Sequence, residues 1–274
     1  MKNNFILLGL LAMLTFTSCK QDLTIEEDVT QQDLSDLESQ QIKSLGFSPQ
    51  GASKEGDEYI VEGDIRLTAE NLKSKDAVTA QFLRVGDEEQ YRTTNLVTGL
   101  PRTIRVLVSG LPTAYAAATD VAIARYNAQS LSLQFQRVTS GSYNILISAA
   151  PSGASYLASA GFPTASGNPY NSVRVNSSYL GSAGTTTWNN YVGTILAHEL
   201  GHCIGFRHTD YYNRAISCGG AVSNEGASTV GAIHIPGTPT TATLSAASWM
   251  LACIGTNQNR PFNSADVTAL NYLY

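Results

Sequence analysis

The sequence predicts an α+β fold, in which a twisted mixed five-stranded sheet carries two long helices on one face. Residues 103–176 alternate strand-like runs with one Ala-rich amphipathic stretch at 112–129. A second, more apolar helical pattern begins near Asn189 and is stopped by Gly205. Beyond residue 210 the chain is rich in Gly, Pro, Ser and Thr, so we expect loops there.

Five stretches supply the predicted strands of this sheet. The runs 103–108 and 131–138 flank the first helix, and 143–149 follows them; all three are rich in β-branched and apolar residues. A weaker fourth strand is predicted at 153–160 and a fifth at 172–176. The order strand, helix, strands, helix favours a mixed sheet with both helices on one side.

The second helix contains the string HELGHCIGFRH at residues 198–208. His198 and His202 are four residues apart, so their imidazoles lie on one face of a helix and can bind one metal ion. Gly205 permits the left-handed turn that returns His208 as a third ligand. Because three of the chain's four histidines fall within these eleven residues, histidines that only make hydrogen bonds are disfavoured.

Three histidine ligands with one open position are typical of a catalytic zinc site, since a structural site fills all four positions with protein groups. We therefore expect one catalytic Zn²⁺, with Glu199 as the general base that takes the proton of the attacking water and passes it to the leaving amine. The predicted activity is that of a zinc endopeptidase acting on proteins or peptides. The alternative is a catalytically weak zinc-bearing surface protein that binds or adheres, although such a module needs no base at Glu199. A structural Ca²⁺ stays unassigned.

The string resembles the HExxHxxGxxH signature of the metzincin metalloendopeptidases at all five defining positions. HELGHCIGFRHTD is similar to the bacterial dual-action HEIGH metallopeptidases, with Leu200 where the name has Ile. The resemblance implies a metzincin-type domain whose antiparallel edge strand, here 153–160, receives extended substrate. It also implies a Met turn beneath the zinc ligands in a loop-rich lower subdomain, for which Met250 is the candidate. A C-terminal helix is predicted at 262–274, with Ser264 as its N-cap.

Residues 1–18 have the pattern of an export signal, with one Lys and a short apolar run followed by small polar residues. The run is too short to span a bilayer. Thr17-Ser18-Cys19 resembles a bacterial lipobox, which implies a lipidated Cys19; ordinary signal cleavage is the alternative. We expect an exported outer-membrane or cell-surface lipoprotein, attached to the membrane only through Cys19, with release as a secreted enzyme also open.

Charge divides the chain into two parts that the net charge of −5 conceals. Residues 20–102 hold seventeen acidic and nine basic side chains, whereas 103–274 holds seven Arg and five acids. This contrast suits a propeptide lying on its enzyme, or an acidic solvated spacer. We therefore divide the chain into a signal peptide (1–18), a polar acidic tether (19–54), a propeptide-like segment (55–102) and a catalytic domain (103–274). No basic, aromatic-interleaved patch predicts nucleic-acid binding, and we expect a monomer.

Val61-Glu62-Gly63-Asp64 resembles the FxGD motif of astacin propeptides, with Val61 in place of Phe. The resemblance implies a zymogen in which the Asp64 carboxylate takes the open zinc position. The alternative is a plain turn acid after Gly63.

Once Cys19 is set aside, three cysteines remain for an oxidising compartment. Cys218 and Cys253 form the predicted disulfide, which leaves Cys203 free and buried; a bridge between Cys203 and Cys218 is the rival pairing. Asp210 is a candidate to orient His208, or it caps a turn.

Overall fold

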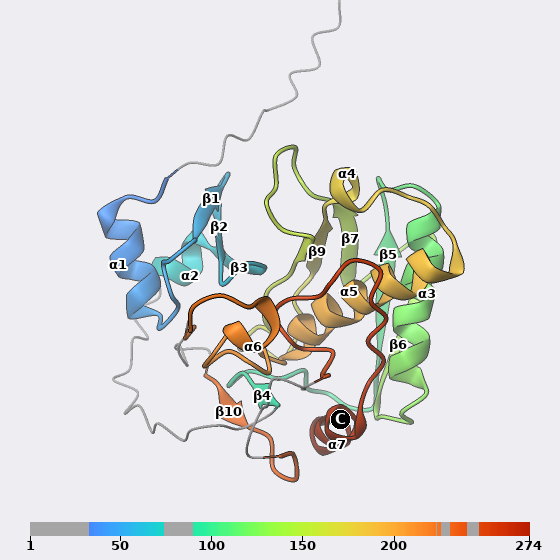
Figure 1. Cartoon of the computed structure of the whole chain (residues 1–274). Coiled ribbons are helices and arrows are strands. Elements are labelled where there is room, and N and C mark those ends of the chain that lie inside the picture. The colour runs from blue at the N-terminus through green and yellow to red at the C-terminus, as the bar shows by residue number, and fades with distance from the viewer. Residues whose placement is uncertain (1–32, 74–89, 223, 226–230, 240–246) are drawn as a thin grey trace, which may run out of the picture.

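The computed structural model describes residues 33–73, 90–222, 224–225, 231–239 and 247–274. The predicted signal peptide and Cys19 lie outside the described residues. Figure 1 shows two parts, a small N-terminal unit on the left and a larger part built around a sheet and the long helix α5. None of the helices within the described ranges is long and apolar enough to cross a membrane.

The larger part contains the predicted five-stranded sheet, in the strand order β6-β5-β7-β9-β8. Its strands are β5 (Arg102–Val108), β6 (Leu133–Val138), β7 (Ile145–Ala149), β8 (Ala158–Ser159) and β9 (Ser172–Val175). Neighbouring strands are parallel except at the edge, where β8 runs antiparallel to β9. The mixed sheet is thus confirmed. Of the predicted fourth strand, only the end, Ala158–Ser159, pairs with a neighbouring strand.

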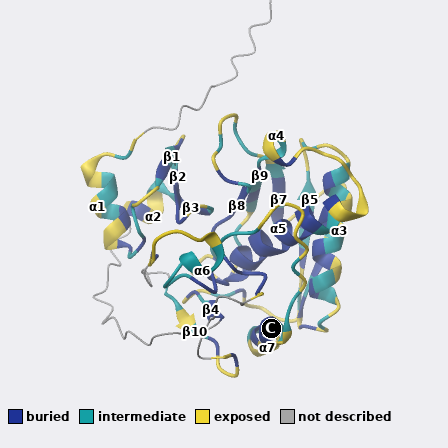
Figure 2. Cartoon of the chain, viewed as in Figure 1, coloured by how far each residue is buried: buried dark blue, intermediate teal, exposed yellow. Residues whose placement is uncertain are grey.

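The two long helices, α3 (Ala114–Asn127) and α5 (Thr186–Ile204), pack against each other beside the sheet. Gly193 permits their close approach, because a Cβ there would lie 2.7 Å from a Val121 methyl carbon. From Trp188 onward nearly every residue of α5 is buried (Figure 2). The helix that carries the metal-binding string is therefore a core element.

The rest of the larger part is mostly irregular, as expected. It includes the short helices α4 (Ser177–Leu180) and α6 (Ala215–Cys218), the two-stranded pairing of β4 (Tyr91–Arg92) with β10 (Ile233–His234), and the C-terminal helix α7 (Ser264–Leu273). The predicted N-cap of α7 is wrong by one residue. Asn263 caps it instead, because its side chain accepts from Asp266 N–H while the Asp266 carboxylate accepts from Asn263 N–H.

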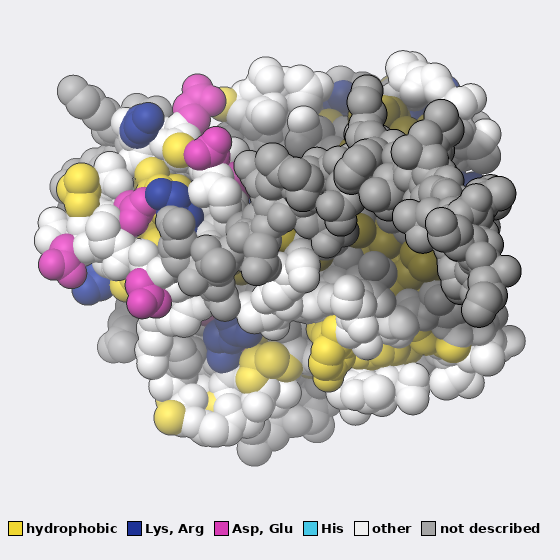
Figure 3. Space-filling model, turned by 90° about the horizontal axis from the view of Figure 1, so that it is seen from above, with side chains coloured by type: hydrophobic (Ala, Val, Ile, Leu, Met, Phe, Trp, Pro, Cys, Tyr) yellow, Lys and Arg dark blue, Asp and Glu magenta, His cyan; other side chains and the backbone are white. Residues whose placement is uncertain are grey.

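The N-terminal unit consists of α1 (Asp36–Ser44), the antiparallel strands β1 (Ser53–Glu55), β2 (Glu58–Val61) and β3 (Ile65–Thr68), and α2 (Ala69–Lys73). It has an apolar cluster of its own, to which Ile42, Phe47 and Tyr59 belong. Residues 36–54, which we assigned to the polar acidic tether, form part of this unit. Figure 3 shows the acidic side chains of one face gathered toward this unit, whose Asp36, Asp57 and Glu70 are exposed.

Candidate active site

The C-terminal half of α5 carries two of the predicted ligands, His198 and His202, together with Glu199. Thr185 caps its N-terminus by accepting from Trp188 N–H at 3.2 Å. At the other end Gly205 is left-handed, with φ 110°, and the chain reverses there. Residues 206–208 then run back toward the helix and bring His208 to His198 and His202.

The three imidazoles are oriented by hydrogen bonds from their Nδ1 atoms. His198 Nδ1 donates to the Trp249 carbonyl at 2.9 Å, and His202 Nδ1 donates to the Phe206 carbonyl at 2.9 Å. His208 Nδ1 lies 3.0 Å from a carboxylate oxygen of Glu225. Because each acceptor fixes the proton on Nδ1, the Nε2 atoms carry the lone pairs that a metal requires.

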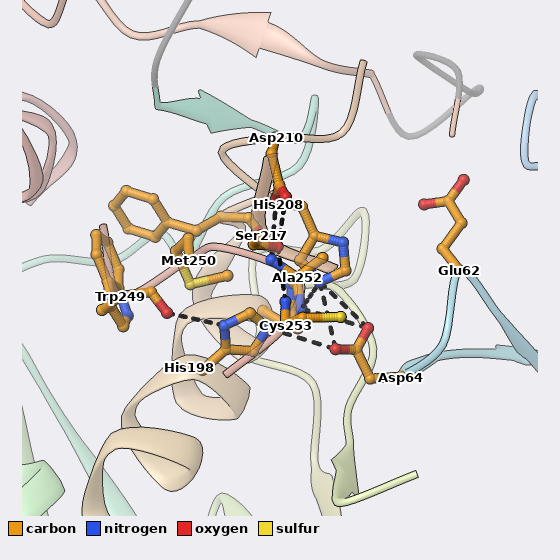
Figure 4. A network of polar contacts seen from close by, with 12 residues as sticks. Glu62, Asp64, His198, His208, Asp210, Ser217, Trp249, Met250, Ala252 and Cys253 are labelled. Atoms are coloured by element: carbon orange, nitrogen blue, oxygen red, sulfur yellow. Dashed lines mark hydrogen bonds and ion pairs between the residues drawn. The ribbon is translucent and has the colours of Figure 1, made fainter. Parts of the chain in front are cut away.

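The Nε2 atoms converge on the carboxylate of Asp64 (Figure 4). Asp64 oxygens lie 3.5 Å from Nε2 of His198, 3.9 Å from that of His202 and 3.2 Å from that of His208. One ligand atom from each of the four residues lies within 4.8 Å of the others. The structure thus brings the three predicted ligands and Asp64 together.

The donor set fits a zinc ion. Within the described residues, Nε2 of His198 and Oδ1 of Asp64 are buried yet have no hydrogen-bond partner. Unsatisfied buried polar atoms are rare in folded proteins unless an ion or water completes them. Three imidazole nitrogens and a carboxylate oxygen are all ordinary zinc ligands.

The family model of the dual-action HEIGH metallo-peptidases matches residues 59–274. The chain belongs to this family of metallopeptidases. Among solved structures it is similar to myroilysin: one structure is 14% identical, covers 66% of this chain and 96% of the other, and has a TM-score of 0.38. A second myroilysin structure is 16% identical, covers 64% and 83%, and has a TM-score of 0.34. No curated protein matches.

Burial sets the protonation of the metallopeptidase site. It lowers the pKa of His202 well below the ordinary value, and the neighbouring His198 and His208 lower it further, so the ring is neutral and able to bind metal. Burial alone would raise the pKa of Asp64, but His208 and His198 outweigh it and hold that pKa well below its usual range. Asp64 is therefore an anion.

Glu199 lies one residue after the first ligand and is 2% exposed. Burial, followed by the charge of Asp64, raises its pKa well above the ordinary value for a carboxyl. In the described part of the chain, its Oε2 atom has no hydrogen-bond partner. A carboxyl group in such surroundings readily takes up a proton, which is what a general base must do.

Sequence reasoning missed the residue that orients the third ligand. Glu225, rather than Asp210, accepts from His208, and it also forms an ion pair with Arg214 at 3.0 Å. The Asp210 carboxylate instead accepts from Ser217 Oγ at 2.5 Å and from Ala252 N–H at 2.9 Å. The second interpretation of Asp210, as a residue that holds a turn, describes these contacts better.

The candidate Met turn lies directly beneath the ligands. Met250 is fully buried, and a Cβ on Gly201 would lie 2.6 Å from its sulfur, so only glycine permits this contact with α5. Thr209 N–H, next to the third ligand, donates to the Met250 carbonyl at 2.8 Å. Trp249, in the same turn, supplies the carbonyl that holds His198.

The cysteines lie as the preferred pairing predicts. Cys218 and Cys253 are joined by a disulfide with a Cα–Cα distance of 5.1 Å, and Cys203 is buried and free. This bridge ties α6 to the segment that follows the Met turn. His234 is part of β10, where its Nε2 lies 2.9 Å from Thr238 Oγ1.

A cavity of about 220 Å³ opens beside His198 and Glu199. Gly63 and Asp64 of the N-terminal unit line part of it. The rest of the lining includes residues of α5, of the segment 155–158 that leads into β8, and of the Met-turn region. The cavity therefore adjoins both a candidate metal ligand and Glu199.

Proposed function

We propose that this metallopeptidase is a zinc-dependent endopeptidase made as a latent precursor, in which Asp64 occupies the fourth coordination position. The observation that carries the proposal is the convergence of His198, His202, His208 and Asp64 on one point. When bound there, zinc polarises a carbonyl oxygen and acidifies water. A carboxylate at the one coordination position that the three histidines leave open prevents water from binding there.

Glu199 is the proposed general base. Its buried carboxylate lies at the metal end of the cavity, and its raised pKa favours uptake of the proton from the attacking water. The same carboxyl then returns the proton to the leaving amine. The negative charge of Asp64 contributes to that raised pKa, after burial.

The sheet edge supports latency in a second way. Arg66 N–H donates to the Ala160 carbonyl at 2.8 Å, and Ala160 N–H donates to the Asp64 carbonyl at 3.1 Å. The N-terminal unit thus forms hydrogen bonds with main-chain groups just beyond β8, where Ile65 and Ala160 form a parallel bridge. An extended substrate would need these same groups to add to the edge.

Charged side chains fasten the N-terminal unit beside the metal centre. Arg66 is fully buried and pairs with Glu55 at 2.8 Å and with Glu58. Arg174, on β9, pairs with both glutamates at 3.1 Å, so the acids of the unit are shared with the larger part. Deeper in the interface, Glu62 pairs with Arg207 at 3.0 Å.

Activation is proposed to cleave the chain before Gln90. Residues after that point belong to the core of the larger part: Arg207 N–H donates to the Tyr91 carbonyl at 2.9 Å, and Thr93 N–H donates to the Gly205 carbonyl at 2.8 Å. Cleavage after these residues would remove support from the reversal that carries His208. The expected catalytic domain, which began at residue 103, is therefore extended to Gln90 in this proposal.

The N-terminal pattern motivates the proposed location. An export signal at 1–18 followed by Cys19 favours an exported lipoprotein, and the disulfide between Cys218 and Cys253 suits an oxidising compartment. Processing before Gln90 would release the catalytic part from such an anchor.

Casein cleavage by the zinc-loaded full-length chain tests the proposal. Glu199→Gln should retain zinc and lower the turnover of the activated form by about 100- to 10,000-fold, the range typical of a lost acid–base group. Asp64→Ala should raise precursor activity, whereas Asp57→Ala, at an exposed turn, should not. Near-normal cleavage by Glu199→Gln would falsify the mechanism, and unchanged precursor activity of Asp64→Ala at equal zinc content would remove the latency role.

A further inference from the structure

The cavity beside the metal centre has a charged end. It extends along α5 from His198 back to Thr194, one helical turn away or about 6 Å. Ile195, Leu157 and Leu251 line its walls with apolar surface, and Arg260 lines it as well. The main-chain N–H of Arg260 donates to Thr194 Oγ1 at 3.1 Å, so this residue lies beside Thr194, one turn of α5 away from the ligand His198.

The Arg260 guanidinium has only neutral partners at short range. Its Nη1 donates to the Cys253 carbonyl at 3.1 Å and its Nη2 to the Gln258 side-chain oxygen at 3.5 Å. No carboxylate among the described residues lies within ion-pair distance of it. Burial lowers the pKa of Arg260, and Asp210 and Asp266 offset this effect without contact. Arg260 is thus a partly buried cation that lines the cavity and forms no ion pair with a described residue.

The other cation of the cavity, Arg214, is already engaged. It pairs with Glu225 at 3.0 Å and also donates to the Glu62 carbonyl. Glu225 belongs to the larger part, so this pairing persists when the N-terminal unit leaves. Arg260 is therefore the lining cation that is available to a ligand carboxylate.

The N-terminal unit leaves this end of the cavity unfilled. Of that unit, only Gly63 and Asp64 line the cavity, and Asp64 points to the histidines (Figure 4). Gly63 has no side chain to place there. The described residues of the N-terminal unit therefore place no side chain at the far end of the cavity.

We propose that Arg260 makes this cavity selective for an acidic side chain, carried by one of the two substrate residues that flank the cleaved bond. The inference rests on the proposed endopeptidase function. The apolar walls contact the methylene groups of the side chain, while the planar guanidinium matches a carboxylate with two parallel donors. Arg260 acts here as a specificity-determining residue and takes no part in the proton transfers.

A peptide library digested by the activated, zinc-loaded protein, made from the full-length chain, tests the inference. Acidic residues should be enriched at one position next to the cleaved bond. For matched peptides that differ only as Glu or Gln at that position, wild type should favour Glu. Arg260→Gln should reduce this ratio of kcat/KM by about 10- to 100-fold, the range of a lost charge-assisted hydrogen bond. Arg260→Glu should shift the preference toward Lys.

Arg137→Gln is the matched control, because Arg137 pairs with Asp120 at the surface and lies outside the cavity lining. It should leave the ratio unchanged. An equal loss for both peptides in Arg260→Gln would mean that Arg260 only supports the Cys253 loop, and would overturn the inference. Wild-type cleavage without acidic preference would do the same while leaving the endopeptidase function intact. No cleavage of any peptide would instead defeat the proposed function.

Discussion

The carboxylate of Glu225 lies 3.0 Å from Nδ1 of His208, and both side chains are buried. This contact holds the ring of the third ligand with Nε2 toward Asp64 and the other two histidines. Burial would lower the pKa of His208, but Glu225, followed by Asp64, outweighs it and raises that pKa well above the ordinary value. The same negative charge makes the ring a stronger ligand when a metal replaces the proton.

Glu225→Gln should therefore weaken zinc binding by about 10- to 100-fold, the usual effect of losing such an orienting carboxylate. The amide still accepts a hydrogen bond from His208 but carries no charge. Competition with a fluorescent chelator in zinc buffers measures the dissociation constant. Asp120→Asn, which changes a half-exposed surface acid, serves as the control. An unchanged dissociation constant for Glu225→Gln would contradict this role.

The three histidines of the candidate metal site could be predicted from the sequence because their geometry is local. Helical periodicity alone sets His198 beside His202, and the left-handed Gly205 returns His208 within the next three residues. The order of strands and helices along the chain could also be predicted, because apolar runs and an Ala-rich helix alternate between residues 102 and 175. The count of cysteines suggested a bridge between Cys218 and Cys253 but left Cys203 with Cys218 as a rival pairing, and only the fold decides between the two.

Contacts between residues that are separated by long stretches of irregular chain could not be predicted from the sequence. Glu225 reaches His208 across seventeen residues without a periodic pattern. The helix α1 is polar and buries only Ile42, so its sequence does not show what it packs against; its place depends on the cluster that it shares with Phe47 and Tyr59. No sequence pattern marks Arg260 as a site residue, because only the fold places it beside Thr194.

Glu62→Ala should loosen the precursor. Glu62 and Arg207 pair at 3.0 Å with both side chains fully buried, and Glu62 holds a left-handed backbone at φ 55° two residues before Asp64. Removing the carboxylate leaves the Arg207 charge less compensated and weakens the segment that carries Asp64. Basal casein cleavage by the precursor should rise, while the activated form should keep its rate. Glu70→Ala, at an exposed position of α2, should change neither rate. If Glu62→Ala left the rate of the precursor unchanged, the pair of Glu62 and Arg207 would not hold Asp64 in place.

The disulfide should stabilise the Met-turn region. Cys218 and Cys253 are 35 residues apart, and closing a loop of that size contributes roughly 3–4 kcal/mol by chain entropy. Thermal unfolding of the double variant Cys218→Ser, Cys253→Ser should therefore occur at a clearly lower temperature than that of wild type. Cys203→Ala, which keeps the bridge, is the control. Mass spectrometry of unreduced peptides would show the rival pairing if Cys203 were found joined to Cys218.

Asp266 should make stability depend on pH. Burial raises its pKa to about 6, and hydrogen bonds from Asn263, Ser248 and Trp249 only partly oppose this effect. Because the folded pKa lies above the unfolded value, near 4, the contribution is fully present below about pH 4. It is lost as pH rises through 6. A shift of this size corresponds to roughly 3 kcal/mol. The loss of stability from pH 4 to 7 should thus be larger for wild type than for Asp266→Asn, which cannot ionise. Urea unfolding at each pH measures both curves, and parallel curves would show that Asp266 is already ionised at pH 4.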